Sequence, residues 1–193
     1  MIVCGVLTDG RDDLLTQTLA SALEHLAGQI DHLYVIHDDF NRKGLAGAVQ
    51  TLWAHAVGVG ADYLFHLEDD WTFRSPVDLD AMRSLVDREH LAQLVLQRQA
   101  LTSDEHAAGG VAAHPHWVQR DGWIEQADIF SLNPCLIPRW VLEQGWPSGP
   151  LGVGNETGMT ARLAGERFGF LGEKHQTPHV QHIGNHRSAE WQL

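Results

Sequence analysis

The sequence predicts an α/β fold with a Rossmann-like, nucleotide-binding half whose mixed central sheet is flanked by helices. Three short apolar runs, residues 2–7, 33–36 and 63–67, alternate with two segments of helical periodicity. Each run stops at polar or acidic residues, and open α/β sheets bind their ligands at such strand ends. The resulting β-α-β-α-β order is typical of a parallel sheet covered by helices.

Glycines delimit the two helical segments. In residues 14–27, leucine and alanine recur at helical spacing until Gly28. The alanine-rich segment 45–59 has the same character and ends at Gly58 and Gly60. Each helix therefore fits between two strands of the predicted sheet.

The rest of the chain has a weaker pattern. Trp117 and Trp123 flank a predicted hairpin turn at residues 120–122. Residues 102–116, rich in Gly, Ala and His, are expected to form a mobile loop. The remaining elements are expected to be, in order, a surface helix at 77–90, strands at 92–97 and 128–132, a helix that begins at Pro138, a loop at 145–154, a helix from Asn155 to about Phe168, and strands at 170–171 and 180–183.

Composition indicates a single globular domain, residues 1–193, with 44% hydrophobic and 20% charged residues. The net charge of −12 disfavours non-specific binding to DNA and to anionic membranes. Cys4 and Cys135 lie in apolar surroundings, so two buried thiols are expected rather than a disulfide framework. No apolar run approaches the roughly 20 residues of a membrane span, and no signal-peptide pattern is present, so we expect a cytoplasmic protein.

The clearest chemical pattern is Glu68-Asp69-Asp70-Trp71, directly after the apolar run 63–67. Adjacent carboxylates repel one another unless a cation neutralises them, and oxygen ligands suit Mg²⁺ or Mn²⁺. An acidic, solvated turn is the alternative interpretation. No glycine-rich phosphate loop of a common type is present, so we expect a metal at Asp70 to hold the phosphates of a nucleotide.

Five motifs follow one another along the chain: Thr8-Asp9-Gly10-Arg11, Asp38-Asp39, Glu68-Asp69-Asp70, Asn155-Glu156 and His182. In this order and spacing they resemble small family 2 glycosyltransferases of the GT-A fold, of bacterial or phage type. The acidic triplet is similar to the Asp-x-Asp metal motif of that family, with Glu in place of its first Asp. The resemblance implies that residues 1–100 bind a nucleotide-sugar and residues 101–193 an acceptor.

The resemblance also implies roles for the first motifs. Thr8, Asp9 and Arg11 would line the nucleoside pocket, and Asp38 or Asp39 would bind the base or ribose of the donor, most simply a UDP-sugar. The alternatives are that Asp9 caps the first helix and that Asp38 and Asp39 start a turn. For Thr8 a structural role is the expectation.

At the acidic motif, the resemblance makes Asp70 a ligand of Mn²⁺ or Mg²⁺ bridging the two phosphates. Asp69 would help it or contact the ribose, and Glu68 completes the motif. A divalent cation stabilises the negative charge that gathers on a leaving nucleoside diphosphate. Trp71 is expected to pack in the core.

Glu156 is similar to the acid that family 2 enzymes place at a helix start to take the proton of the acceptor. An inverting transfer needs such a base on the face opposite the leaving group. The alternative role is that of a first-turn glutamate favoured by the helix dipole. Asp128, before the strand predicted at 128–132, is the second candidate for the base.

The C-terminal region contains His179, His182 and His186. In a strand, His179 and His182 fall on opposite faces because their separation is odd, so they are not expected to bind one ion together. A single late His completes the metal shell in many GT-A enzymes, and His182 resembles it best. Arg187 is then placed to grip a phosphate through two hydrogen bonds.

The function predicted from these residues is the metal-dependent transfer of a sugar, with inversion, from a nucleotide-sugar to a hydroxyl group. A metal-dependent nucleotidyltransferase and a non-catalytic module that binds sugar or nucleotide are the alternatives. The acceptor can be a saccharide, a lipid, a protein or a modified nucleobase. The sequence does not specify the oligomeric state.

Overall fold

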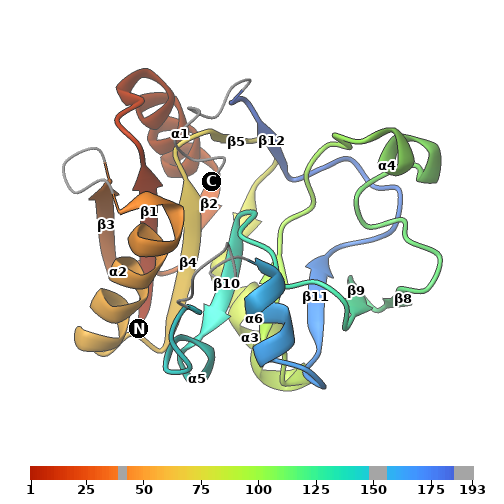
Figure 1. The fold of residues 1–193 in the computed structure, drawn as a ribbon. Helices are drawn as coiled ribbons and strands as arrows, with labels where there is room; N and C mark the ends of the chain where they lie inside the picture. Colours follow the sequence, from red (N-terminus) through yellow and green to blue (C-terminus); the bar gives the residue numbers. More distant parts are fainter. Residues whose placement is uncertain (39–42, 148–155, 185–193) are drawn as a thin grey trace.

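An eight-stranded mixed sheet forms the centre of the structure, a computed structural model that describes residues 1–38, 43–147 and 156–184 (Figure 1). The spatial order of the strands is β3-β1-β4-β10-β7-β11-β9-β8. In chain order these strands are β1 (Ile2–Thr8), β3 (His32–His37), β4 (Tyr63–Glu68), β7 (Gln93–Val95), β8 (Val118–Arg120), β9 (Trp123–Gln126), β10 (Cys135–Pro138) and β11 (Phe168–Leu171).

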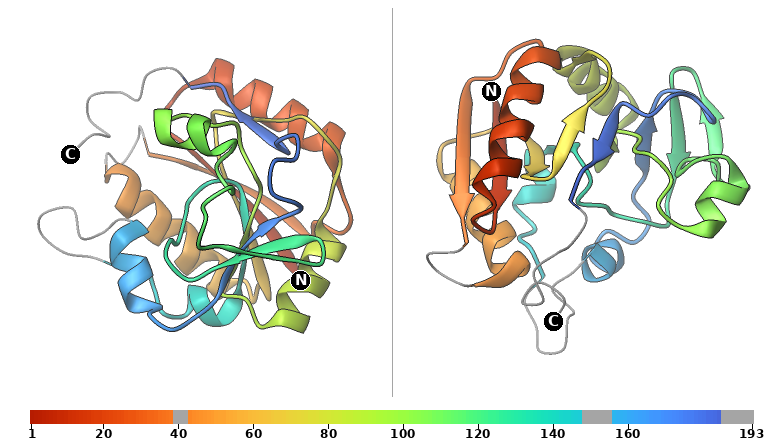
Figure 2. Two further views of the ribbon diagram at one scale, coloured as in Figure 1. Left: turned by 90° about the vertical axis from the view of Figure 1, so that its right-hand side faces the viewer. Right: turned by 90° about the horizontal axis from the view of Figure 1, so that it is seen from above.

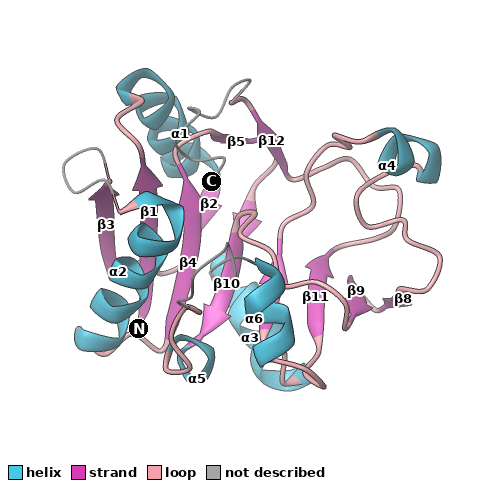
Figure 3. Ribbon diagram, in the orientation of Figure 1, coloured by secondary structure: helices cyan, strands magenta, loops and turns pink. Residues whose placement is uncertain are grey.

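Helices cover both faces of this sheet, and each face has its own apolar core (Figure 2). The first core includes side chains of α2, α5 and α6, and the second includes side chains of α1 and α3. The helices are α1 (Asp12–His25), α2 (Gly44–Gly58), α3 (Leu79–Glu89), α5 (Arg139–Leu142) and α6 (Glu156–Arg162). A sixth helix, α4 (Ser103–Ala108), lies among long loops at one end of the molecule (Figure 3).

The parallel strands β3, β1 and β4 confirm the predicted β-α-β-α-β unit. β1 lies between the other two, and its last residues pair with His37 and Glu68. In the middle of β1, Gly5 has no side chain where Leu52 of α2 approaches, since an added Cβ would lie 2.4 Å from the Leu52 side chain. Close packing of α2 therefore depends on glycine at this position.

The strand β10 was not predicted, although it lies at the centre of the sheet. It is antiparallel to β4 on one side and to β7 on the other. Pro138 therefore ends a strand, and the helix expected to begin there, α5, starts one residue later. Because β10 joins β4 to β7, the halves predicted at residues 1–100 and 101–193 share one sheet, and that division stays a prediction.

Two short sheets are attached to the main one. β12 (Val180–His182) pairs in antiparallel fashion with β5 (Trp71–Phe73), the strand that follows the acidic motif. β2 (Leu26–Ala27) pairs in parallel with β6 (Val77–Asp78). The first of these pairs brings the C-terminal part of the described chain to the acids.

Three other predictions of secondary structure are wrong. The strand expected at 128–132 is a loop, because Gln126 closes it with hydrogen bonds to the N–H groups of Asp128 and Ile129. The loop expected at 102–116 contains α4, which begins with a capping box of Thr102 and Glu105. The helix expected to reach Phe168 ends at Arg162.

No helix among the described residues is long and apolar enough to span a membrane.

Candidate functional site

Three adjacent parallel strands place polar side chains at one edge of the sheet. Asp38 follows β3, Thr8 ends β1, and Glu68 ends β4 directly before Asp69 and Asp70. Backbone hydrogen bonds continue the ladder past the strands, from the Asp38 N–H to the Thr8 carbonyl and from the Asp69 N–H to the Leu7 carbonyl, both at 2.9 Å. The motifs that are separated in sequence are therefore neighbours in space.

The side chain of Asp69 is held from several directions. The Thr8 hydroxyl donates to its Oδ2 at 2.6 Å, and the Arg11 guanidinium donates to its Oδ1. Burial raises the pKa of Asp69 to about 6, because it outweighs the hydrogen bond from Thr8 and the charge of Arg11. With both oxygens bonded, Asp69 serves to fix the positions of Thr8 and Arg11.

Arg11 connects the acids at the strand ends. Its guanidinium donates to Asp9 Oδ1 at 2.6 Å, to Asp69 Oδ1, and to Asp70 Oδ2 at 3.0 Å. Burial lowers the pKa of Arg11, but the charges of Asp69 and Asp70 raise it by more, so its pKa is above the usual value and the group stays charged. One guanidinium thus contacts three carboxylates.

Asp70 is buried and only partly bonded. Its Oδ2 lies 3.0 Å from Arg11 Nη1 and 3.2 Å from His182 Nε2, whereas its Oδ1 is buried without a hydrogen-bond partner among the described residues. Burial raises the pKa of Asp70, but the hydrogen bond and charge of His182 and the charge of Arg11 hold it below its usual value. Asp70 is therefore ionised, with one oxygen available to a ligand.

His182 reaches Asp70 because β12 lies beside β5. Its backbone pairs with that of Trp71, whose ring packs 4.9 Å from the imidazole between centroids. The Gln99 side chain accepts from the His182 N–H and donates to the His182 carbonyl, both at 3.0 Å. Two residues on, Gly184 lies so close that an added Cβ would be 2.4 Å from Asp70 Oδ2.

These groups fit a divalent cation. Asp70 Oδ1, which has no hydrogen bond among the described residues, and the adjacent imidazole of His182 offer one oxygen donor and one nitrogen donor. Within the described ranges no three His, Cys, Asp or Glu side chains are grouped to hold a metal ion. Asp70 and His182 would then hold the cation with help from the phosphates of a ligand, the usual arrangement for Mg²⁺.

The remaining residues predicted to contact the nucleotide are Asp38, Glu68, Asp39 and Arg187, and the structure describes the first two. Both carboxylate oxygens of Asp38 accept backbone N–H groups at the start of α2, from Lys43 at 2.9 Å and from Gly44 at 2.8 Å. Glu68 is buried at the end of β4, on the sheet face opposite to Asp69. Asp39 and Arg187 lie outside the described residues.

The two candidates for the base lie in the second half of the chain. The Glu156 side chain, at the start of α6, accepts the Leu132 N–H at 2.5 Å. Burial raises the pKa of the Cys135 thiol, and the charges of Glu156 and Glu68 add to the rise, so both acids lie near β10. Asp128 lies in the loop after β9 and accepts the Trp117 indole N–H at 2.9 Å.

Two supporting contacts were missed in the sequence. The Thr18 hydroxyl of α1 donates to the Asp69 carbonyl at 2.7 Å and accepts the Trp71 N–H at 3.1 Å. The Ser21 hydroxyl, one turn later, accepts the Phe73 N–H at 2.8 Å. The detectable signal was two hydroxyl residues three apart on the inward face of an amphipathic helix.

Known proteins match this chain through their structures. No protein-family model and no curated protein matches it. The crystal structure of S. aureus TarS matches with a TM-score of 0.62 and 10% identity over 95% of this chain and 36% of TarS. TarS 1–349 in complex with UDP matches with a TM-score of 0.58 and 9% identity, over 93% of this chain and 59% of that one.

A third match has about the same length as this chain. The crystal structure of A197 from STIV has a TM-score of 0.58 and 12% identity, over 97% of this chain and 98% of A197. This chain spans less than two thirds of either TarS chain. At these identities the likeness concerns the fold, and by that measure this chain is a small α/β domain of the GT-A type.

Proposed function

We propose that this protein is a glycosyltransferase that moves a sugar from a nucleotide-sugar, most simply a UDP-sugar, to a hydroxyl group with inversion. The observation that carries the proposal is the burial and bonding of the Asp70 carboxylate. It is a buried carboxylate beside His182, with one unpartnered oxygen, at the sheet edge where nucleotides bind in this kind of fold. The UDP complex of TarS, a structure with the same fold, supports the choice of nucleotide.

In this proposal Asp70 and His182 hold Mn²⁺ or Mg²⁺. When bound, the cation stabilises the negative charge of the leaving diphosphate. Arg11 adds a second positive charge beside the acids, since its guanidinium already contacts Asp70. The ion pair of Arg11 with Asp69 keeps that guanidinium at the strand ends.

The nucleoside contacts divide into two kinds. The side chains of Thr8 and Asp38 are buried and use their oxygens within the protein, so they position the strand ends rather than touch the donor. Arg11 keeps 24% of its side chain exposed, and Asp9 lies beside it. We assign direct contact with the donor to Arg11, and to Asp9 a supporting role, since its side chain is 8% exposed and accepts from Arg11. Asp39 and Arg187 stay candidates outside the described residues.

Glu156 is proposed as the base that takes the proton of the acceptor hydroxyl. One of its oxygens accepts the Leu132 N–H, which fixes the side chain and leaves the other oxygen for the acceptor. Asp128 is the second candidate, and its bond to the Trp117 indole makes it the less available of the two. The acceptor hydroxyl belongs to a saccharide, a lipid, a protein or a modified nucleobase.

The test is a binding and turnover screen with full-length protein. Isothermal titration with UDP, UDP-glucose, UDP-galactose and UDP-N-acetylglucosamine, with and without Mn²⁺, is expected to show tighter binding when Mn²⁺ is present. Nucleoside triphosphates serve as the comparison, because a nucleotidyltransferase would prefer them. The proposal fails if no nucleoside diphosphate or nucleotide-sugar binds, or if Asp70→Asn leaves Mn²⁺-dependent binding unchanged.

A further inference from the structure

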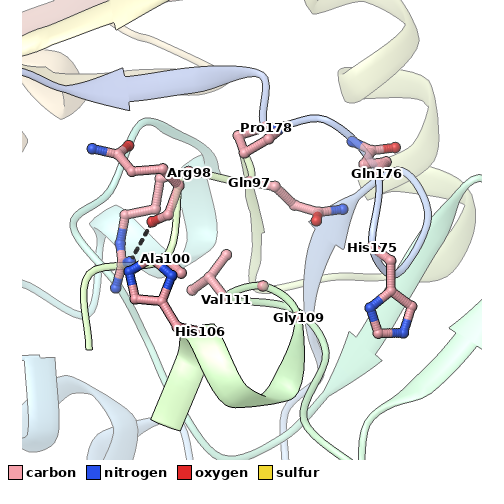
Figure 4. Close-up of a pocket in the computed structure, with 11 residues that line it drawn as sticks. Gln97, Arg98, Ala100, His106, Gly109, Val111, His175, Gln176 and Pro178 are labelled. Carbon is pink, nitrogen blue, oxygen red and sulfur yellow. Dashed lines mark hydrogen bonds between the residues drawn. The ribbon is translucent and has the colours of Figure 1, made fainter. Parts of the chain in front are cut away.

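A cavity of about 320 Å³ lies in the second half of the molecule, between loops that follow β7 and β11 (Figure 4). The segment after β7 contributes Gln97 and Ala100, the region of α4 contributes His106 and Val111, and the loop before β12 contributes His175 and Pro178. Its volume is at the lower end of the range of about 300–1,000 Å³ that small-molecule sites occupy. The cavity therefore suits one small ligand or one end of a larger one.

The cavity lies along the same sheet edge as the acids. β7 is parallel to β11, and it runs in the direction of β4 because β10 is antiparallel to both β4 and β7. The carboxyl ends of β7 and β11 consequently point the same way as those of β3, β1 and β4. Since α/β sheets bind ligands at this edge, the topology gives the cavity a place next to the candidate donor site.

One wall of the cavity also supports the candidate cation site. Gln99, which lines the cavity, bonds through its side chain to both backbone groups of His182. The carbonyl of Gln97 accepts the N–H groups of His179 at 2.8 Å and Val180 at 3.1 Å. A ligand in the cavity is thus separated from His182 by a single segment of chain.

The lining offers hydrogen bonds but no unpaired charge. Arg98 is the charged residue among those that line the cavity, and it donates to both oxygens of Glu105, at 3.0 and 2.9 Å. The imidazoles of His106 and His175 make no hydrogen bond with any residue that the structure describes, and an imidazole can both donate and accept. Val111 adds an apolar surface between them, as Figure 4 shows.

We propose that this cavity binds the acceptor and that the acceptor presents an uncharged saccharide to it. The hydroxyl groups of a sugar match the donors and acceptors of His106 and His175, and the C–H groups of its ring match Val111 and Pro178. An anionic acceptor would find no unpaired cation here, because the charge of Arg98 is already matched by Glu105. This inference rests on the proposed function, whose acceptor class it narrows.

The test uses saturation-transfer NMR on the full chain with methyl glycosides of glucose, galactose and N-acetylglucosamine as probes. UDP with Mn²⁺ is the second ligand, measured in the same samples. Val111→Phe fills the cavity, and His106→Ala and His175→Ala remove hydrogen-bonding groups from it. His116→Ala is the matched control, because His116 is an exposed imidazole nearby that does not line the cavity.

At least one methyl glycoside is expected to bind the unaltered protein and His116→Ala equally. Glycoside binding should be lost in Val111→Phe. It should be weakened about threefold to tenfold in His106→Ala and in His175→Ala, which is the effect of one lost hydrogen bond. UDP binding should be the same in all of them. If Val111→Phe fails to fold, the two histidine variants decide.

The experiment also separates failure of the acceptor assignment from failure of the proposed function. If UDP binds but no glycoside does, or if glycosides bind the cavity variants as well as the unaltered protein, the acceptor assignment is wrong while the proposed function stands. If neither UDP nor any other nucleoside diphosphate binds the unaltered protein, the proposed function itself is wrong.

Discussion

Arg11 and Asp70 form an ion pair at the strand ends, with Nη1 3.0 Å from Oδ2, while the other carboxylate oxygen of Asp70 is buried and has no hydrogen bond with any residue that the structure describes. The guanidinium therefore balances part of the charge of the acids and competes with any other cation for them. Because it serves three carboxylates, its removal changes both the charge of the site and its attraction for metal ions.

We expect Arg11→Gln to bind Mn²⁺ more tightly than the unaltered protein when no nucleotide is present. The substitution removes a competing positive charge, and a gain of about tenfold corresponds to about 1.4 kcal/mol. Titration followed by the electron paramagnetic resonance of free Mn²⁺ measures this directly. Arg120→Gln is the control, because it removes an arginine whose ion pair is with Glu125 and not with Asp9, Asp69 or Asp70. Weaker Mn²⁺ binding in Arg11→Gln would contradict the competition.

Gly184→Ala is expected to weaken the binding of Mn²⁺ and of UDP. An added Cβ would lie 2.4 Å from Asp70 Oδ2 and 2.9 Å from Asp70 Cβ, so the carboxylate must move. Overpacking of this kind destabilises proteins by about 1–3 kcal/mol, which thermal unfolding would register. Gly58→Ala is the matched control, because an added Cβ there meets nothing within 4 Å. Unchanged Mn²⁺ and UDP binding would show that the position of Asp70 is unimportant.

Glu156→Gln is expected to lower kcat about 10²- to 10⁴-fold while UDP binding stays the same, because a general base acts on the acceptor and not on the donor. The isosteric amide keeps an oxygen for the Leu132 N–H, so the fold should persist. Asp128→Asn is the comparison, measured by release of UDP from the donor under the same conditions. A large loss of kcat in Asp128→Asn with normal turnover in Glu156→Gln would reverse the assignment.

The ion pair of Arg98 and Glu105 makes stability depend on pH. Burial raises the pKa of Glu105, but the hydrogen bonds from Arg98 and from the Leu101 and Thr102 N–H groups outweigh it and lower the pKa to about 2. A folded pKa below the ordinary value of 4.5 means that the stabilisation is complete above that pH and is lost as the pH falls toward 2.

Glu105→Gln should therefore destabilise the protein at pH 7 and much less at pH 3. We expect a difference of about 1 kcal/mol in the free energy of unfolding after allowance for solvent screening, measured by urea denaturation at both pH values. Glu143→Gln removes an exposed ion pair with Arg139 and is the control. An equal effect of Glu105→Gln at the two pH values would contradict the role of its charge.

The first half of the chain was well predicted because its signals are local. The apolar run before Glu68 has the length of a strand, and the acids that follow it mark where that strand ends. Parallel strands bring such ends together, so the proximity of Thr8 to Asp69 follows from the fold class. The contact between His182 and Asp70 was expected from the resemblance alone, and the pairing of β12 with β5 explains it.

The second half was less predictable because its structure depends on distant partners. β10 has four residues between Pro134 and Arg139, and nothing in that short apolar segment indicates a place in the middle of a sheet. The ion pairs of Arg11 were also missed. The resemblance placed Arg11 in a nucleoside pocket, which stays a prediction, and the structure adds its ion pairs with Asp69 and Asp70, residues more than fifty positions away.

The acids stand on the ends of strands, whereas the cavity is built from connecting segments. Strand ends are fixed by the ladder of backbone hydrogen bonds on both sides, and loops tolerate exchange of sequence and length. The region of α4 can therefore diverge without disturbing Asp70, whereas Gln97 and Gln99 must stay because they hold β12 and His182 in place. Under the proposed function, an engineer who grafted new loops around α4 would alter which molecule receives the sugar and keep the residues that bind the donor.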